Sequence, residues 1–289
     1  MRNIDNIMSK KRMSKIAKKR LDRDLDAIYK RLNKNEYEIS GITENVFDVA
    51  DTTKRHYEQI KTYAEIGKTW SQILQHLNIH KYKEILDILP GHSPKIELAL
   101  FYLNYKGTVI ALNKNSDSLV QLTKFMELFK PRFAIASYTH DLFSPLTKQF
   151  PLVIGNHIID DMICDYFAKK FNISSEKIYE SELEFISIWN KILKSEKNNR
   201  NEIVQKIESV FINLISPNGY LCLAQYKSYI ERMLDVDRAY SFSKKVFNEV
   251  VKNLCKNGFV EIDFSNYITS KKHSYFRQED TAILKRIKA

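Results

Sequence analysis

The sequence from residue 84 onward alternates short apolar runs with segments of helical pattern, and this alternation constrains the fold more than any other feature. Five runs are short enough to form one buried strand each. They are EILDIL (84–89), GTVIAL (107–112), RFAIAS (132–137), FPLVIGN (150–156) and GYLCLAQY (219–226). Helical patterns lie between them, as in PKIELALFYLN (94–104), SLVQLTKFMELF (118–129) and the long stretch at about 160–215. Strands that alternate with helices predict βαβ units, and therefore a parallel sheet with helices on both faces.

The last part of the sequence predicts two more strands joined by a hydrophilic turn. These are FVEIDFSNY (259–267) and TAILKRIK (281–288). A terminal hairpin of this kind is antiparallel, so it would make the parallel sheet a mixed one. We therefore expect an α/β fold with a doubly wound, seven-stranded mixed sheet, mostly parallel, that carries an antiparallel hairpin strand near its C-terminus.

Residues 21–80 have no strand pattern and are typical of helices. An apolar residue recurs every three or four positions, as on one helix face, at Leu21, Leu25, Ile28 and Leu32. Gly41 and Gly67 are expected to break these helices. We expect two domains, a helical N-terminal cap or lid over residues 1–80 and a sheet domain over residues 81–289.

The net charge of +11 is concentrated near the N-terminus. Residues 9–20, SKKRMSKIAKKR, hold seven Lys and Arg and no acid, and without them the net charge would be +4. Such an arm could contact nucleic acid or another acidic surface. No aromatic-rich groove motif accompanies it, so a solvated helix start is the favoured interpretation.

Composition and cysteine usage limit the class of protein. With 44% hydrophobic and 12% aromatic residues, the chain is globular. No apolar run reaches the roughly 18 residues of a membrane span, and the N-terminus lacks the apolar segment of a secretory signal. Cys164, Cys222 and Cys255 are widely spaced, which fits a reducing compartment and gives no metal pattern. We expect a cytoplasmic protein with no membrane partner and no metal.

Polar residues follow the first two predicted strands. In open parallel sheets, ligands bind beyond the carboxyl ends of the strands where the strand order reverses, and the first strand normally lies there. The loop after it, LPGHSPK, contains Gly91, which can adopt positive φ, and Ser93, which can cap a helix beginning near Pro94. Asn113 ends the second strand, and its amide can both accept and donate a hydrogen bond.

The end of the fourth strand carries the most informative pattern. Asn156 and His157 follow the strand, and a helix with the paired acids Asp160 and Asp161 comes next. FPLVIGNHIIDDM resembles the FDLVIANHVLHHL segment of class I S-adenosylmethionine-dependent methyltransferases, and ISPNGYLCLAQY resembles their LKPGGYLVLSDY approach to strand five. LDILPGHS stands where that family has an LDLGCGTG-type loop, and VIALNKN stands for its second strand. The resemblance covers roughly residues 81–265 and implies a Rossmann-like fold.

The resemblance also implies a cofactor, S-adenosylmethionine, and roles for single residues. The methionine end would lie near four residues of the first loop region: Asp87, Pro90, Gly91 and Ser93. Asn113 would face the ribose, and Asp141, in SYTHDLF, would contact the adenine edge. Asn156 and His157 would face the reacting centre, with His157 as a base or a donor to the substrate.

The sequence departs from the family pattern at three places. Leu89 and Ser93 replace glycines of the loop, Asn113 replaces the acid that usually binds the ribose, and Pro151 replaces a common Asp. Simpler roles also stay open. Asp87 could only bond loop amides, Asn113 could only end its strand, and His157 could be a helix-start histidine with a satisfied ring. Asp160 and Asp161 are most simply acids favoured by the helix dipole.

Aromatic residues offer a further class of cofactor contact, because aromatic faces attract a sulfonium as they attract other cations. We expect one or two of the following to line the cofactor: Tyr29, Tyr57, Tyr63, Trp70, Tyr138 and Tyr226.

Four functions fit this sequence. The first is a biosynthetic methyltransferase that uses S-adenosylmethionine on a small molecule in a capped pocket. The second consumes the cofactor without methylation, by azetidine-2-carboxylate-type cyclisation with release of methylthioadenosine, or by aminopropyl-type or 3-amino-3-carboxypropyl transfer. The third is a nucleic-acid methyltransferase, which the basic arm at 9–20 supports and the absence of an NPPY-type loop does not. The fourth is a binding module that has lost the cofactor. A homodimer stays open.

Overall fold

The computed structural model contains one seven-stranded sheet in the order β3-β2-β1-β4-β5-β7-β6. The structure describes residues 52–127, 129–174, 178, 182–227, 237–264 and 277–287, with residues 52–61 and 182–183 described by their backbone alone. The basic arm at 9–20, the break expected at Gly41, Tyr29 and the side chain of Tyr57 therefore lie outside what is described.

Five parallel strands and two antiparallel ones make the sheet. The strands are β1 Glu84–Ile88, β2 Thr108–Asn113, β3 Ala134–Thr139, β4 Phe150–Asn156, β5 Ile215–Ala224, β6 Phe259–Glu261 and β7 Thr281–Arg286. β1 pairs in parallel with β2 and with β4, and β4 pairs in parallel with β5. β7 runs antiparallel to β5 and to β6. The predicted doubly wound, seven-stranded mixed sheet is confirmed, and with it the Rossmann-like fold that the resemblance implied.

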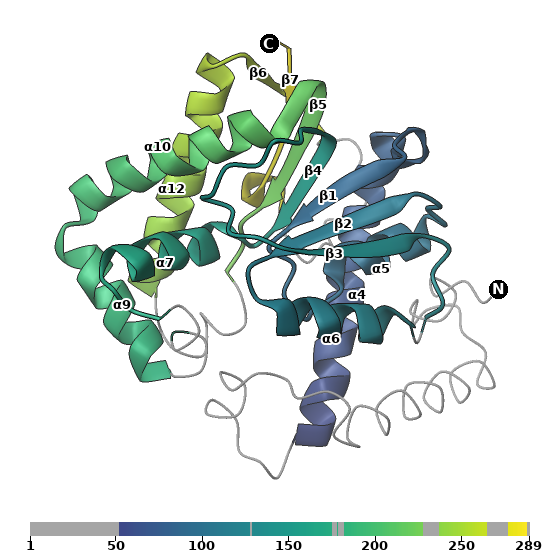
Figure 1. Ribbon diagram of the computed structural model, residues 1–289, viewed down its shortest axis with the longest axis horizontal. Helices are drawn as coiled ribbons and strands as arrows, with labels where there is room; N and C mark the ends of the chain where they lie inside the picture. The colour runs from purple at the N-terminus through teal and green to yellow at the C-terminus, as the bar shows by residue number, and fades with distance from the viewer. Residues whose placement is uncertain are drawn as a thin grey trace.

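Helices cover both faces of this sheet (Figure 1). They are α4 Thr52–His76, α5 Lys95–Tyr102, α6 Ser116–Glu127, α7 Ile159–Lys170, α9 Glu182–Lys194, α10 Glu196–Leu214 and α12 Asp237–Lys256, with single 3-10 turns η3 Ile79–Lys81 and η4 Gln278–Asp280. Side chains of α4, α5 and α6 share one buried cluster with one face of the strands, and those of α7, α9, α10 and α12 share another with the opposite face. No described helix contains a stretch both long and apolar enough to cross a membrane.

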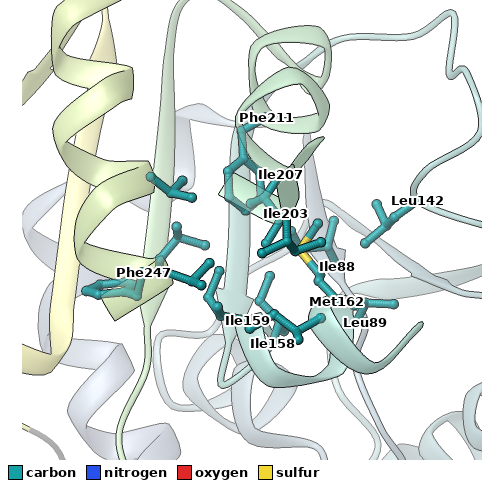
Figure 2. Close-up of a cluster of buried hydrophobic side chains, with 14 of the residues drawn as sticks. Ile88, Leu89, Leu142, Ile158, Ile159, Met162, Ile203, Ile207, Phe211 and Phe247 are labelled. Atoms are coloured by element: carbon teal, nitrogen blue, oxygen red, sulfur yellow. The ribbon is translucent and has the colours of Figure 1, made fainter. Parts of the chain in front are cut away.

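The larger cluster shows how alternation along the strands builds the core. Ile88 of β1 contributes to it together with Ile158 and Met162, at the start of α7, and Ile207 and Phe211 of α10 (Figure 2). The neighbouring strand residues point to the other face, where Ile85 packs in the cluster of α4 and α5. Successive strand side chains point to opposite faces, so two separate clusters follow from one apolar run.

Gly67 does not break the first described helix, contrary to expectation. α4 continues through it from Thr52 to His76. A Cβ on Gly67 would lie 2.9 Å from the Lys95 carbonyl oxygen and 3.0 Å from the Leu98 Cβ. The glycine is therefore used for the close approach of α4 to α5, which lets α4 join the core of the sheet. The domain boundary at residue 80 stays a prediction.

The connection from β3 to β4 contains no helix, although a doubly wound pattern normally has one. Residues 140–149 form turns and extended chain instead. β3 is consequently the exposed edge of the sheet, and Tyr138 on it is 53% exposed.

Replacing Gly67 by Leu should lower the free energy of unfolding by about 1–3 kcal/mol, because the added side chain must push α5 away from α4. Chemical denaturation measures the change. Gly91→Ala is the matched control: its Cβ would meet only the Ser93 nitrogen, at 3.9 Å, so it should change stability by less than about 0.5 kcal/mol. A Gly67→Leu protein as stable as the parent would contradict the close helix contact.

Candidate functional site

The carboxyl ends of β1 and β4 lie side by side at the centre of the sheet, and the chain leaves them in opposite directions. From β1 it goes to β2, on one side, and from β4 it goes to β5, on the other. This is the place where an open parallel sheet leaves a crevice for a ligand. The sequence-predicted residues Gly91, Asn113 and Asn156 follow or end β1, β2 and β4, so the fold brings them to this edge.

The loop after β1 turns at Leu89 and not at Gly91. Leu89 has a φ of 50°, in the left-handed region that costs a side chain steric strain, while Gly91 has no positive φ. The Leu89 side chain is buried in the larger core cluster, and its N–H donates to the Leu112 carbonyl at 2.8 Å. Gly91 can adopt a positive φ, but in this loop Leu89 takes the left-handed conformation instead. Gly91 is exposed, and a Cβ added there would have only the Ser93 nitrogen within 4 Å, at 3.9 Å.

Ser93 is not the helix cap that the sequence indicated. Pro94 is the N-cap of α5, and no side chain caps that helix. The Ser93 carbonyl accepts from the N–H of Lys95 at 2.8 Å. Pro94 is buried at the start of α5, at the place where a side-chain cap by Ser93 was expected.

Asn113 ties the first loop to the end of β2. Its Nδ2 donates to the Pro90 carbonyl at 2.9 Å, and its Oδ1 accepts from the N–H of Asn115, also at 2.9 Å. The side chain is buried, and an aspartate could accept the second bond but could not donate the first. The replacement of the family's acid by Asn thus has a structural use. Its contact with a ribose stays a prediction.

Asn156 joins three elements at the end of β4. The indole N–H of Trp70, on α4, donates to Asn156 Oδ1 at 2.8 Å. Asn156 Nδ2 donates to the Tyr226 hydroxyl, after β5, at 3.0 Å. Trp70 is fully buried and Tyr226 is 5% exposed. The helix that precedes the sheet in sequence is therefore connected by a partly buried hydrogen bond to the residue predicted to face the reacting centre.

The ring of His157 is held from three sides. Its Nε2 lies 3.3 Å from Asp160 Oδ2, and its Nδ1 lies 3.4 Å from Gln225 Nε2. The ring also stacks on Tyr226, with centroids 5.1 Å apart. Gln225 is fully buried, donates to Asp160 Oδ1 at 3.2 Å, and accepts from the Ile159 N–H at 3.1 Å. Both ring nitrogens thus have protein neighbours, and the predicted roles of His157 as base or donor remain predictions.

Asp87 and Glu97 form a buried carboxyl pair on the two sides of the first loop. Asp87, on β1, is 2% exposed and Glu97, on α5, is 0% exposed. Burial, then the charge of Glu97 and its hydrogen bond, raises the pKa of Asp87 well above its usual range, and the charge of Lys95 opposes this. Burial raises the pKa of Glu97 to about 7, although its hydrogen bond with Asp87 and the charge of Lys95 act in the other direction. Burial and the closeness of two like charges therefore favour the protonated form of this pair more than that of an exposed carboxyl.

Lys95 lies among four acids. Burial lowers the pKa of Lys95, while the charges of Asp161, Asp160, Asp87 and Glu97 act to raise it. Its ammonium lies 5.9 Å from the centre of the Tyr63 ring, on α4. Perturbed pKa values from burial and specific charges gather at functional sites more than elsewhere, so this cluster is a candidate for one.

Asp141 lies in a different hollow from the central residues. A cleft of about 820 Å³ is bounded by the loop after β3, α7 and α10, and both Asp141 and Lys114 line it. Asp141 Oδ1 accepts from the N–H of Phe143 at 3.0 Å, and its other oxygen lies 3.8 Å from the Lys169 ammonium. The cleft reaches the ends of β2 and β3 through Lys114 and Asp141. It does not include Asn156 or the first loop, and the adenine contact of Asp141 stays a prediction.

Several residues of this site could not be assigned from the sequence. Gln225 had no signal of its own, since it follows an apolar strand as many polar residues do. For Glu97 and Lys95 the sequence does hold a signal, because a charged residue inside the apolar stretch PKIELALF is uncommon. Within the described ranges, no group of three or more His, Cys, Asp or Glu side chains is arranged to hold a metal ion.

The sequence matches no protein-family model, and no curated protein matches it either. Solved structures with a similar fold include the plantazolicin methyltransferase BpumL in complex with SAH, at 11% identity and a TM-score of 0.46, over 93% of this chain and 97% of that one. The pyocyanin biosynthetic protein PhzM has 11% identity and a TM-score of 0.47, over 86% and 62%. The N-methyltransferase NodS from Bradyrhizobium japonicum WM9 has 8% identity and a TM-score of 0.42, over 77% and 97%.

Trp70→Phe should lower the free energy of unfolding by about 1 kcal/mol more than Trp189→Phe, because it removes the donor of a partly buried hydrogen bond to Asn156. Trp189 is a matched control, since it is also buried but its indole N–H has no hydrogen-bond partner among the residues that the structure describes. Chemical denaturation of both variants checks the difference. Equal losses would show that the bond between α4 and β4 adds nothing to stability.

Glu97→Gln should make stability less dependent on pH. The pKa of Glu97 in the folded chain, about 7, lies above the usual 4.5, so the folded chain keeps a proton that the unfolded chain loses between these values. Stability of the parent must then fall as the pH rises from about 4.5 to about 7. Relative to the parent, Glu97→Gln should gain at least about 1 kcal/mol between pH 5 and pH 8. Parallel stability profiles for the two proteins would contradict the raised pKa.

Proposed function

We propose that this protein is an S-adenosylmethionine-dependent methyltransferase that acts on a small molecule. The observation that carries the proposal is the strand order, in which β1 and β4 meet at the centre of the sheet and present the first loop, Asn113 and Asn156 at one edge. The first loop and the ends of β2 and β4, which belong to motifs that resemble the family, therefore lie at one edge of the sheet, and this supports the proposal.

The residues at this edge fit the cofactor chemically. Gly91 is exposed, and a Cβ added there would have only the Ser93 nitrogen within 4 Å, at 3.9 Å, which supports the close approach of a ligand to the backbone. We assign the methionine end to Asp87, Pro90, Gly91 and Ser93. We assign the ribose to Asn113, which positions the loop through Pro90, and the adenine edge to Asp141.

Methyl transfer depends on alignment of the reacting groups and on exclusion of water more than on acid or base groups. S-adenosylmethionine, when bound, supplies an electrophilic methyl group. In the proposal, Asn156 and His157 face the acceptor, and Trp70 and Tyr226 keep the Asn156 amide in one orientation. Removal of a proton by His157 requires that one ring nitrogen first leaves Asp160 or Gln225.

A small acceptor is favoured over a polymer by the position of α4. Trp70 connects this helix to the end of β4 by a partly buried hydrogen bond. A helix tied by one side chain to the end of β4 supports a closed pocket better than an open groove.

Calorimetry with S-adenosylhomocysteine tests the proposal. We expect saturable binding of one ligand per chain, and a flat titration would overturn the function. Incubation with S-adenosylmethionine alone then distinguishes the reaction types. If methylthioadenosine forms without an acceptor, the protein catalyses a reaction at another carbon of the sulfonium and not methyl transfer.

Asn113→Ala should weaken S-adenosylhomocysteine binding about fivefold or more, the effect of one lost buried hydrogen bond. The loss would act through the loop, which is held by Asn113 at Pro90. Asn201→Ala, at an exposed position of α10, is the control and should bind as the parent does. An unchanged dissociation constant for Asn113→Ala would remove Asn113 from the site.

A further inference from the structure

We propose that the outer side of β3 pairs with β3 of a second copy of this chain, in antiparallel orientation, about a two-fold axis at Ser137. The two sheets would then form one continuous sheet, with the α6 helices of the two copies packed side by side. The inference goes beyond the proposed function and does not depend on it, because β2 separates this edge from the meeting point of β1 and β4.

β3 has one neighbouring strand and one open side. It pairs with β2, and among the described residues no strand lies on its other side. The N–H groups of Ala134 and His140 donate to carbonyl oxygens on the β2 side, each at 3.1 Å. The backbone groups of successive strand residues point to opposite sides. The groups that point away from β2 therefore belong to Ile135, Ser137 and Thr139.

The residues of β3 leave this side open to pairing. Natural sheet edges are usually protected by charged side chains, by proline or by a bulge. The strand sequence AIASYT contains no charge and no proline, and its register with β2 runs without a shift from residue 134 to residue 139. All six residues are exposed except Ile135, which is half-buried. An edge of this kind is a template for pairing with another strand.

The side chains of β3 are complementary to those of a second copy in antiparallel orientation. A two-fold axis perpendicular to the sheet keeps every side chain on its own face, so opposite residues are either both odd-numbered or both even-numbered. An axis at Ser137 places this residue opposite itself and Ile135 opposite Thr139, which uses all three outward-pointing residues. On the other face, Tyr138, which is 53% exposed, would lie opposite the small and exposed Ala136. Each ring thus covers an alanine of the other copy.

α6 lies beside this edge and fits the same axis (Figure 1). It packs over β2 and β3, since side chains of all three elements form one apolar cluster. The two copies of α6 would lie two strand spacings apart, about 10 Å, and packed helices are usually about 8–10 Å apart. The side of α6 toward the edge carries Thr123, whose hydroxyl lies 3.3 Å from that of Ser137. Val120, one turn before Thr123, is 49% exposed, and the second α6 would cover it.

The charges at the two ends of this edge are of opposite sign. Asp117, in the first turn of α6, and Asp141, after β3, lie at one end, where Lys114 is already paired with Asp165. At the other end, three exposed basic residues outnumber one exposed acid among the described residues: Lys124, Lys130 and Arg132 against Glu127. An antiparallel arrangement places the basic end of each copy beside the acidic end of the other, and this complementarity favours a second copy as the partner.

Sedimentation equilibrium of the full chain tests the pairing. We expect a monomer–dimer equilibrium at concentrations from about 1 to about 100 μM, with a dimer of twice the 34.0 kDa of the chain. Ser137→Lys should weaken the dimer at least about fivefold, because it sets two like charges directly opposite each other. Val260→Lys, at an exposed position of β6 on the opposite edge, is the control and should dimerise as the parent does.

A mixture of two variants tests the position of the axis. Ser137→Glu alone should also weaken the dimer, and an equimolar mixture of Ser137→Lys and Ser137→Glu should restore it, because residue 137 lies opposite its own copy. Circular dichroism checks that both variants are folded. A parent that stays monomeric, a mixture that does not associate, or an equal loss of the dimer in Val260→Lys would each overturn the inference.

Amide hydrogen exchange of the parent identifies what covers the edge, and it decides the matter even where a variant is unfolded. The amides of Ile135, Ser137 and Thr139 should become protected as the concentration of the chain rises. Protection that is the same at every concentration would show that another segment of the same chain covers β3, and this would overturn the inference. None of these results bears on cofactor binding, so the proposed function stands or falls separately.

Discussion

The parallel pairing of β1 with β2 on one side and β4 on the other is the constraint on which the rest of the structure depends. It fixes the point where the chain order reverses, and the first loop, Asn113, Asn156 and Gln225 lie at or just after the carboxyl ends of these strands or of β5. The pairing is itself held by apolar side chains on both faces, since neighbours such as Ile85 and Leu86 belong to different core clusters. A buried strand of this kind cannot shift by one residue without exposing its apolar set.

Polar contacts then connect the strand ends into two groups. One group links Trp70, Asn156 and Tyr226, and through the stacked His157 ring it reaches Gln225 and Asp160. The other links Asp87 with Glu97 behind the loop, with Lys95 beside them. The first group orients amides and aromatic rings. The second group holds two carboxyl groups whose pKa values are raised by burial.

Much of the fold was predictable because it depends on patterns that a strand or helix must show. The run at 150–156 has the bounds of β4, and the other strands differ from their predicted ranges by a few residues, with β6 the shortest. Gly67 was misjudged, because its role depends on a helix that lies nearby only in space. The left-handed conformation of Leu89 in the loop after β1 was not foreseen for a similar reason. Burial of the Leu89 side chain in the core holds the residue in a conformation that its type disfavours, and sequence patterns do not show such packing.

A structure of the complex with S-adenosylhomocysteine tests the central claim most directly. The account predicts the ligand across the ends of β1 and β4, with its ammonium within about 4–6 Å of the Asp87 carboxyl and its backbone contacts at Gly91. A ligand bound in the cleft between the loop after β3 and α10 instead, with the β1–β4 edge left empty, would contradict it.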